Sequence, residues 1–164
     1  MITTVYFLLF ILSVGYLFLL LSRFRQNISV YYVLMSVCVI LINYGYWQSS
    51  LAATLEEALS ACRISYLGSA FVGYVIFRCI AELTKTTVPA VLQYIWVGLD
   101  TVILLLAMTI GRSDLYYKSV RLMQKDGFSY LVKEYSPLHL LFVVQIILTI
   151  VGGLLIVAIS FTRQ

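Results

Sequence analysis

The first stretch of the chain, ITTVYFLLFILSVGYLFLLL at residues 2–21, decides the class of fold. It carries no charged side chain over about 20 residues, the length that an α-helix needs to cross the hydrocarbon core of a bilayer. Arg23 and Arg25 follow it. A signal peptide has its basic residues before a shorter apolar core. We therefore expect a membrane helix and not a cleaved leader.

The rest of the chain has the same apolar character. Of its 164 residues, 62% are hydrophobic and 11% are charged, and the mean hydropathy is +1.00. Five crossings would use about 100 residues, which leaves little room for a water-soluble catalytic module. We read the net charge of +4 as a sign of membrane topology and exclude nucleic acid as a partner.

Four further apolar runs have the length of a membrane helix, at about residues 28–47, 58–81, 88–110 and 137–161. Helix start signals precede three of them: a Thr54–Glu57 capping box, Pro89, and a Ser136 cap with Pro137 in the first turn. The sequence thus predicts an all-α polytopic bundle of five transmembrane helices, formed by residues 1–164 as one domain with the lipid bilayer as its partner.

The longest segment between these runs is the outer loop, residues 111–136. Asp126-Gly127 stands there between two stretches rich in strand-forming residues, which is a signal for a tight hairpin. We predict a β-hairpin at about residues 118–133 that covers one end of the bundle. An irregular loop is the alternative.

Basic residues in short loops indicate which side of the membrane is cytoplasmic. Arg23 and Arg25 form a compact pair without an acid, and Arg78, Lys85 and Arg163 belong to the same side. The other side holds six basic residues, most of them in the outer loop, so the count alone does not decide. The compact arginine pair favours a plasma-membrane protein with its N-terminus outside and its C-terminus in the cytoplasm.

Several short motifs carry a resemblance. EEAL at residues 56–59 and CRISYLG at residues 62–68 resemble the third helix of the N-terminal seven-helix region of bacterial sensor histidine kinases, a module also attached to some diguanylate cyclases. DLYY at residues 114–117, Gly127 and SPLH at residues 136–139 are similar to that family's outer loop. The resemblance implies two further helices and an output module after residue 164, or a short relative that works with another protein.

Function follows from this resemblance as a hypothesis. It implies a sensory domain that binds an extracellular or membrane-borne ligand, a small molecule or a peptide, and passes a helix rearrangement to a cytoplasmic output. A small transporter or channel and an accessory membrane subunit are the alternatives. A homodimer is a further candidate assembly.

Asp100 is the clearest candidate for a functional residue. A charged side chain at mid-membrane costs at least about 2.5 kcal/mol, so such residues are rare without a role. Arg63 and Arg78 on the preceding helix are the candidate partners, and Arg63 is preferred because its depth is closer to that of Asp100. A packing role, or a protonated aspartate bonded to a neighbouring helix, is the alternative.

Other polar and aromatic side chains fall at a similar depth and predict a pocket that opens to the outside. With Asn43, the candidate ligand-binding residues are Tyr44, Trp47, Arg63, Asp100, His139 and Gln145. In the alternative interpretation the aromatic residues are interface anchors, and the amides form bonds between helices.

Small residues recur every fourth position on the third helix, at Ala61, Ser65, Ser69 and Gly73. Such a stripe lets helices approach closely, within one chain or across a dimer. The three cysteines lie in membrane helices without metal-ligand spacing, and the chain has one histidine. We therefore expect no metal site, no cofactor and no catalytic residue within this chain.

Overall fold

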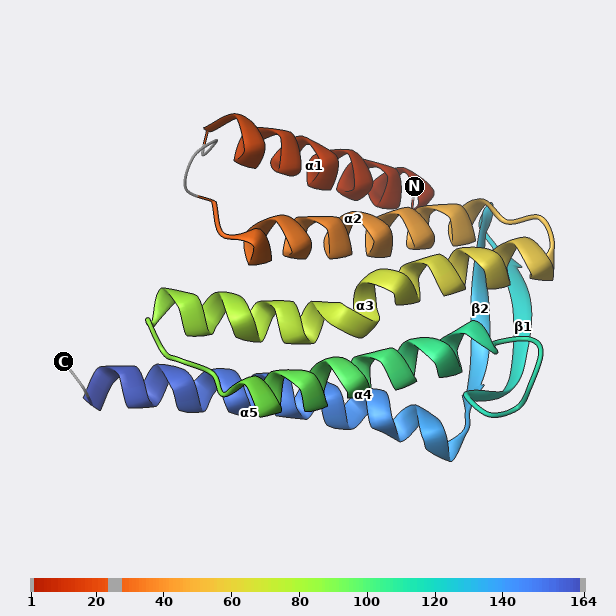
Figure 1. Ribbon diagram of the computed structural model, residues 1–164. Helices are drawn as coiled ribbons and strands as arrows, with labels where there is room; N and C mark the ends of the chain where they lie inside the picture. The colour runs from red at the N-terminus through yellow and green to blue at the C-terminus, as the bar shows by residue number, and fades with distance from the viewer. Residues whose placement is uncertain (1, 24–27, 163–164) are drawn as a thin grey trace.

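In the described part of the chain, five long helices and one β-hairpin are the main elements of the fold (Figure 1). The computed structural model describes residues 2–23 and 28–162, so Arg25 and Arg163, used above to orient the chain, lie outside the described residues. All five helices are long and apolar enough to cross a membrane, which confirms the predicted bundle. They are α1 (Ile2–Arg23), α2 (Val30–Leu51), α3 (Leu55–Leu83), α4 (Ala90–Met108) and α5 (Leu140–Thr162).

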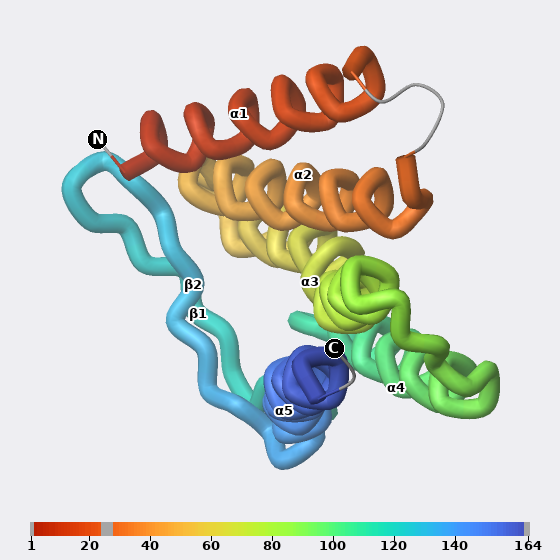
Figure 2. The backbone as a smooth tube through the Cα atoms, turned by 90° about the vertical axis from the view of Figure 1, so that its left-hand side faces the viewer, coloured from red at the N-terminus to blue at the C-terminus, as the bar shows by residue number. Residues whose placement is uncertain are grey.

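The helices are arranged around α3. Figure 2 shows α1, α2 and α3 following one another, with α4 and α5 beyond α3. Helix α3 contacts α2, α4 and α5, and α4 also contacts α5, whereas α1 packs mainly against α2. The helix that carries the predicted stripe of small residues is therefore the centre of the bundle.

Glycines set the close contact between α2 and α3. A Cβ atom added at Gly45 would lie 2.6 Å from the Cβ of Ser65, and one added at Gly68 would collide with the carbonyl oxygen of Cys38. The predicted stripe thus packs within the chain, but against two helices: Ser65 faces α2, whereas a Cβ at Gly73 would lie 2.6 Å from Thr149 Oγ1 of α5.

The predicted start of α3 is confirmed in detail. The Glu57 amide donates to Thr54 Oγ1 at 3.3 Å, and the Glu57 carboxylate accepts from the Thr54 amide at 3.2 Å. A 3-10 turn, η1 (Pro137–His139), precedes α5, with Ser136 at its N-cap position and Pro137 in its first turn, as predicted. The Ser136 side chain makes no capping bond, however. The Ser136 amide donates to the Tyr116 carbonyl at 3.2 Å, which closes the base of the hairpin.

The outer loop contains the predicted hairpin. Strands β1 (Tyr117–Lys125) and β2 (Phe128–Tyr135) pair antiparallel, with Lys125 opposite Phe128. Asp126 and Gly127 between them have φ of 50° and 77°, the left-handed pair that a two-residue type I′ turn requires. The hairpin crosses one end of the bundle from α5 towards α1 (Figure 2). We call this the hairpin end and the opposite end the far end.

Candidate functional site

An aromatic cluster joins the hairpin to α3 and α5. The Tyr117 hydroxyl shares a hydrogen bond with the Tyr66 hydroxyl, and the Lys133 ammonium lies 5.2 Å from the centre of the Tyr117 ring. Burial raises the pKa of the Tyr117 phenol above its ordinary value, and either hydroxyl of the pair can be the donor. The cluster consists of Tyr66, Tyr116, Tyr117, Tyr135, His139 and Phe142.

His139 lies in the middle of this cluster. Its ring centre is 4.3 Å from that of Tyr135, 5.1 Å from that of Tyr116 and 5.9 Å from that of Phe142. Because His139 ends the 3-10 turn before α5, these ring contacts fix the first turn of α5 to the base of the hairpin.

The tip of the hairpin is joined to the connection between α2 and α3. The buried Ser129 hydroxyl donates to the Ala52 carbonyl at 2.6 Å. An open cavity of about 360 Å³ lies here, lined by residues 50–53 on one side and 124–129 on the other. A second cavity of about 320 Å³ lies between α2 and α3, and Leu51 and Ala52 line both cavities.

Asp100 belongs to a buried polar junction between three helices. Its carboxylate is fully buried, and Oδ1 accepts a hydrogen bond of 2.6 Å from Gln145 Nε2 of α5. The same amide donates to the Ala70 carbonyl of α3. Asp100 Oδ2 is buried and has no hydrogen-bond partner in the described part of the chain. The junction therefore links α3, α4 and α5 and leaves one carboxylate oxygen unpaired.

The predicted pairing of Asp100 with Arg63 is wrong. Arg63 Nη2 donates to the Ile110 carbonyl at 2.6 Å, just after the end of α4, where a cation is favoured by the exposed carbonyl groups. The Arg78 guanidinium lies 4.5 Å from the centre of the Tyr31 ring at the far end. The Asp100 carboxyl group meets the Gln145 amide of a neighbouring helix, and its protonation there stays a prediction.

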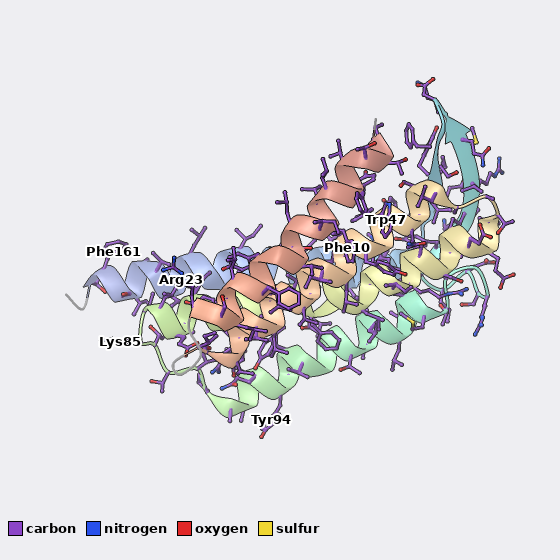
Figure 3. All side chains as sticks on the ribbon, turned by 90° about the horizontal axis from the view of Figure 1, so that it is seen from above. Phe10, Arg23, Trp47, Lys85, Tyr94 and Phe161 are labelled. Atoms are coloured by element: carbon purple, nitrogen blue, oxygen red, sulfur yellow. The ribbon has the colours of Figure 1, made fainter. Side chains whose placement is uncertain are left out.

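The predicted pocket does not form as one site, because its residues face different neighbours. Trp47 packs on Phe10 of α1 with ring centres 5.6 Å apart (Figure 3), and Tyr44 lies 5.4 Å from the same ring. The Asn43 amide reaches the Leu9 carbonyl of α1 at 3.4 Å. His139 belongs to the aromatic cluster and Gln145 to the Asp100 junction. Tyr44 also lines the cavity between α2 and α3.

Sequence reasoning missed two residues that tie the hairpin to the bundle, Ser129 and Lys133. Lys133 Nζ donates to Cys62 Sγ at 3.4 Å and lies beside two tyrosine rings. The available signal was their position on β2, since residues 129, 131 and 133 share one face of a strand. Within residues 2–23 and 28–162, no group of three His, Cys, Asp or Glu side chains is placed to hold a metal ion.

The chain matches the model of a known protein family. The model of a family described as the N-terminal 7TM region of histidine kinase matches residues 4–164. No curated protein and no solved structure matches the chain. The match runs through all five helices and the hairpin.

Proposed function

The chain belongs to the family of N-terminal seven-transmembrane regions of histidine kinases, and from this premise we propose that it detects a ligand at its hairpin end. Membership makes it a multi-pass membrane sensory domain that is not itself catalytic. The proposal adds that an extracellular or membrane-borne ligand binds there and that the resulting helix rearrangement reaches a cytoplasmic output module.

The observation that carries the proposal is the cavity between the hairpin tip and the α2–α3 connection. Its two walls belong to separate elements that the Ser129–Ala52 hydrogen bond joins. A ligand in this cavity touches both walls, so its affinity depends on their spacing. A ligand that binds the domain more tightly at one wall spacing than at another shifts the domain towards the conformation with that spacing.

The contacts of the hairpin supply a route from this cavity into the membrane. At its base, the hairpin is bonded to α3 through Tyr117 and Tyr66 and contacts the start of α5 through His139. Deeper in the bundle, the Asp100–Gln145 bond ties α4 to α5, and the Gln145–Ala70 bond ties α5 to α3. A displaced hairpin would therefore move α3, α4 and α5 together.

A thermal-stability assay tests ligand binding. The purified chain, in lipid nanodiscs, is heated with one of two preparations. One is growth medium from cells that naturally make the protein, and the other is the total lipid extract of those cells. We expect one of these to raise the melting temperature. Ala53→Trp fills the cavity and should abolish the rise, whereas Leu115→Trp, at an exposed site outside it, should keep it. No rise with either preparation, or an equal rise in Ala53→Trp, would refute the proposal.

Cysteine labelling tests the proposed orientation, with the hairpin end outside. The three native cysteines are buried, so a new exposed one reports its own side. We expect Lys125→Cys in the hairpin to react with a membrane-impermeant maleimide in intact cells. Lys85→Cys at the far end should react only after the cells are opened. The reverse pattern would place the sensing end in the cytoplasm.

A transporter would behave differently, and the same protein can be tested for it. Among the described residues, the unpaired Oδ2 of Asp100 is the observation that favours a proton pathway. Proton flux into liposomes that disappears in Asp100→Asn would support transport and contradict a purely sensory role.

A further inference from the structure

A cavity of about 400 Å³ lies at the far end, where α3 turns into α4. Figure 3 shows Lys85 of this turn at the same end of the bundle as Arg23. Polar and charged side chains dominate the wall that the turn contributes, and α2 adds Tyr31. The charged and hydroxyl side chains that line this cavity are those of Arg78 and Glu82 from α3 and of Lys85, Thr86 and Thr87 from the turn.

The length of α3 places this cavity at the level of the lipid headgroups. Its 29 residues give a helix of about 43 Å, against a hydrocarbon core of about 30 Å. About 6 Å therefore projects at each end. Arg78 is five residues before the last residue of α3, so its Cα lies close to the boundary of the hydrocarbon core. The cavity opens where phosphate groups are concentrated.

Arg78 supplies the main reason to expect an anion. Its guanidinium stacks over the Tyr31 ring, with 4.5 Å to the ring centre, and its Nε is buried without a hydrogen-bond partner in the described residues. A buried donor without a partner is costly. The planar guanidinium matches two oxygens of a phosphate group, and stacking on an aromatic ring leaves its edge free to donate.

The neighbouring groups favour the same ligand. Lys85 is exposed and adopts a left-handed backbone conformation with φ of 52° in the turn between the helices. Helix α4 begins beside the cavity without a side-chain cap, so its first amide groups are available to an anion. Glu82 opposes them, but it is exposed and screened by solvent. Two cationic side chains face one anionic side chain.

We propose that this far-end cavity binds a phosphate group, carried by the headgroup of an anionic phospholipid or present as free phosphate. Arg78 holds it from within, and Lys85 closes over it from the turn. The site is separate from the ligand cavity at the hairpin end. Phosphate binding here therefore does not depend on the proposed sensory function. By joining α2, α3 and the start of α4, a bound phosphate would fix the far ends of these helices.

Binding of short-chain lipids tests the site. The purified chain in a nonionic detergent is titrated with dihexanoyl phosphatidylglycerol, dihexanoyl phosphatidylcholine or inorganic phosphate, and the melting temperature is recorded. We expect phosphatidylglycerol to bind more tightly than phosphatidylcholine. Loss of a charge-assisted bond in Arg78→Gln should weaken it by about tenfold or more. Lys85→Gln should weaken it by about threefold, since its charge is exposed.

Arg112→Gln is the matched control, because Arg112 is exposed at the hairpin end, and it should bind as the wild type does. Inorganic phosphate with the same dependence on Arg78 and Lys85 would support a site for free phosphate. Its failure, with phosphatidylglycerol effective, would support a lipid site. If Arg78→Gln does not fold, Lys85→Gln decides. Unchanged binding in the folded variants, or no preference for either anionic probe over the zwitterionic phosphatidylcholine, would overturn the proposal.

Discussion

Helices α1 and α3 are both long and apolar enough to cross a membrane, yet their surroundings within the protein are opposite. Twelve of the 29 residues of α3 are buried, whereas none of the 22 described residues of α1 is. Helix α3 contacts three other helices and both strands, and α1 packs mainly on α2. Length and hydropathy therefore identify a membrane helix but do not say how central it is.

The difference follows from side-chain size and polarity. Lipid tails are as apolar as leucine, so an apolar surface alone gives helices no reason to associate in a membrane. Leucine and phenylalanine make up ten of the 22 residues of α1, and lipid satisfies these side chains as well as another helix does. Helix α3 carries Ser65, Gly68 and Ala70, which allow close contact with its neighbours. Small and polar residues, more than large apolar ones, mark the centre of this bundle.

Gly68→Ala should cause the largest loss of stability and so tests the central place of α3. The added methyl group would collide with the Cys38 carbonyl of α2, and backbone atoms have little freedom to move away. We expect a loss of about 3 kcal/mol, at the upper end for overpacking. Unfolding by sodium dodecyl sulfate in mixed micelles, followed by circular dichroism, measures it.

Gly15→Ala on α1 is the matched control. Nothing lies within 4 Å of a Cβ added at Gly15, so the substitution should leave stability unchanged or raise it by about 0.5 kcal/mol through helix propensity. Equal losses in the two variants would mean that α1 is packed as closely as α3, and the comparison would fail.

Gln145→Leu should cause the second-largest loss. It removes the hydrogen bond to Asp100 Oδ1 and leaves the buried carboxyl group with no partner, at a cost of about 2 kcal/mol. Replacing both groups, in Asp100→Val with Gln145→Leu, should recover at least half of that loss because no unpaired polar atom remains. The same denaturation assay applies. A double variant as unstable as the sum of both single variants would show that the bond does not couple α4 and α5.

The fold itself could be predicted closely from the sequence. Apolar runs of about 20 residues fixed the number of helices, and Asp126-Gly127 fixed the hairpin turn, because both signals depend on local physics. At Ser136 the local signal gave the N-cap position but not the contacts, because the side chain makes no capping bond. The Ser136 amide donates to the Tyr116 carbonyl, which is near in space only because the hairpin brings the two ends of the loop together.

The site was harder to predict because depth along a helix does not give the face of the helix. Trp47 and Gln145 were grouped by similar depth, yet Trp47 faces α1 and Gln145 faces Asp100 in the core. Which helix lies beside which is a property of the whole bundle. Asp100 was identified correctly as unusual, since a buried carboxylate is informative wherever it lies, but its partner was not.

Phe10→Ala should cause the smallest of these losses and tests the outer side of the comparison. Phe10 packs on Tyr44 and Trp47 of α2, and aromatic pairs are worth about 1 kcal/mol. Phe18→Ala on the same helix is the control, because Phe18 is 70% exposed and faces lipid. We expect a loss of about 1 kcal/mol for Phe10→Ala and none for Phe18→Ala in the detergent assay. If Phe10→Ala lost as much stability as Gly68→Ala, α1 would be as integral to the bundle as α3. Aromatic contacts would then hold α1 as firmly as close backbone contacts hold α3.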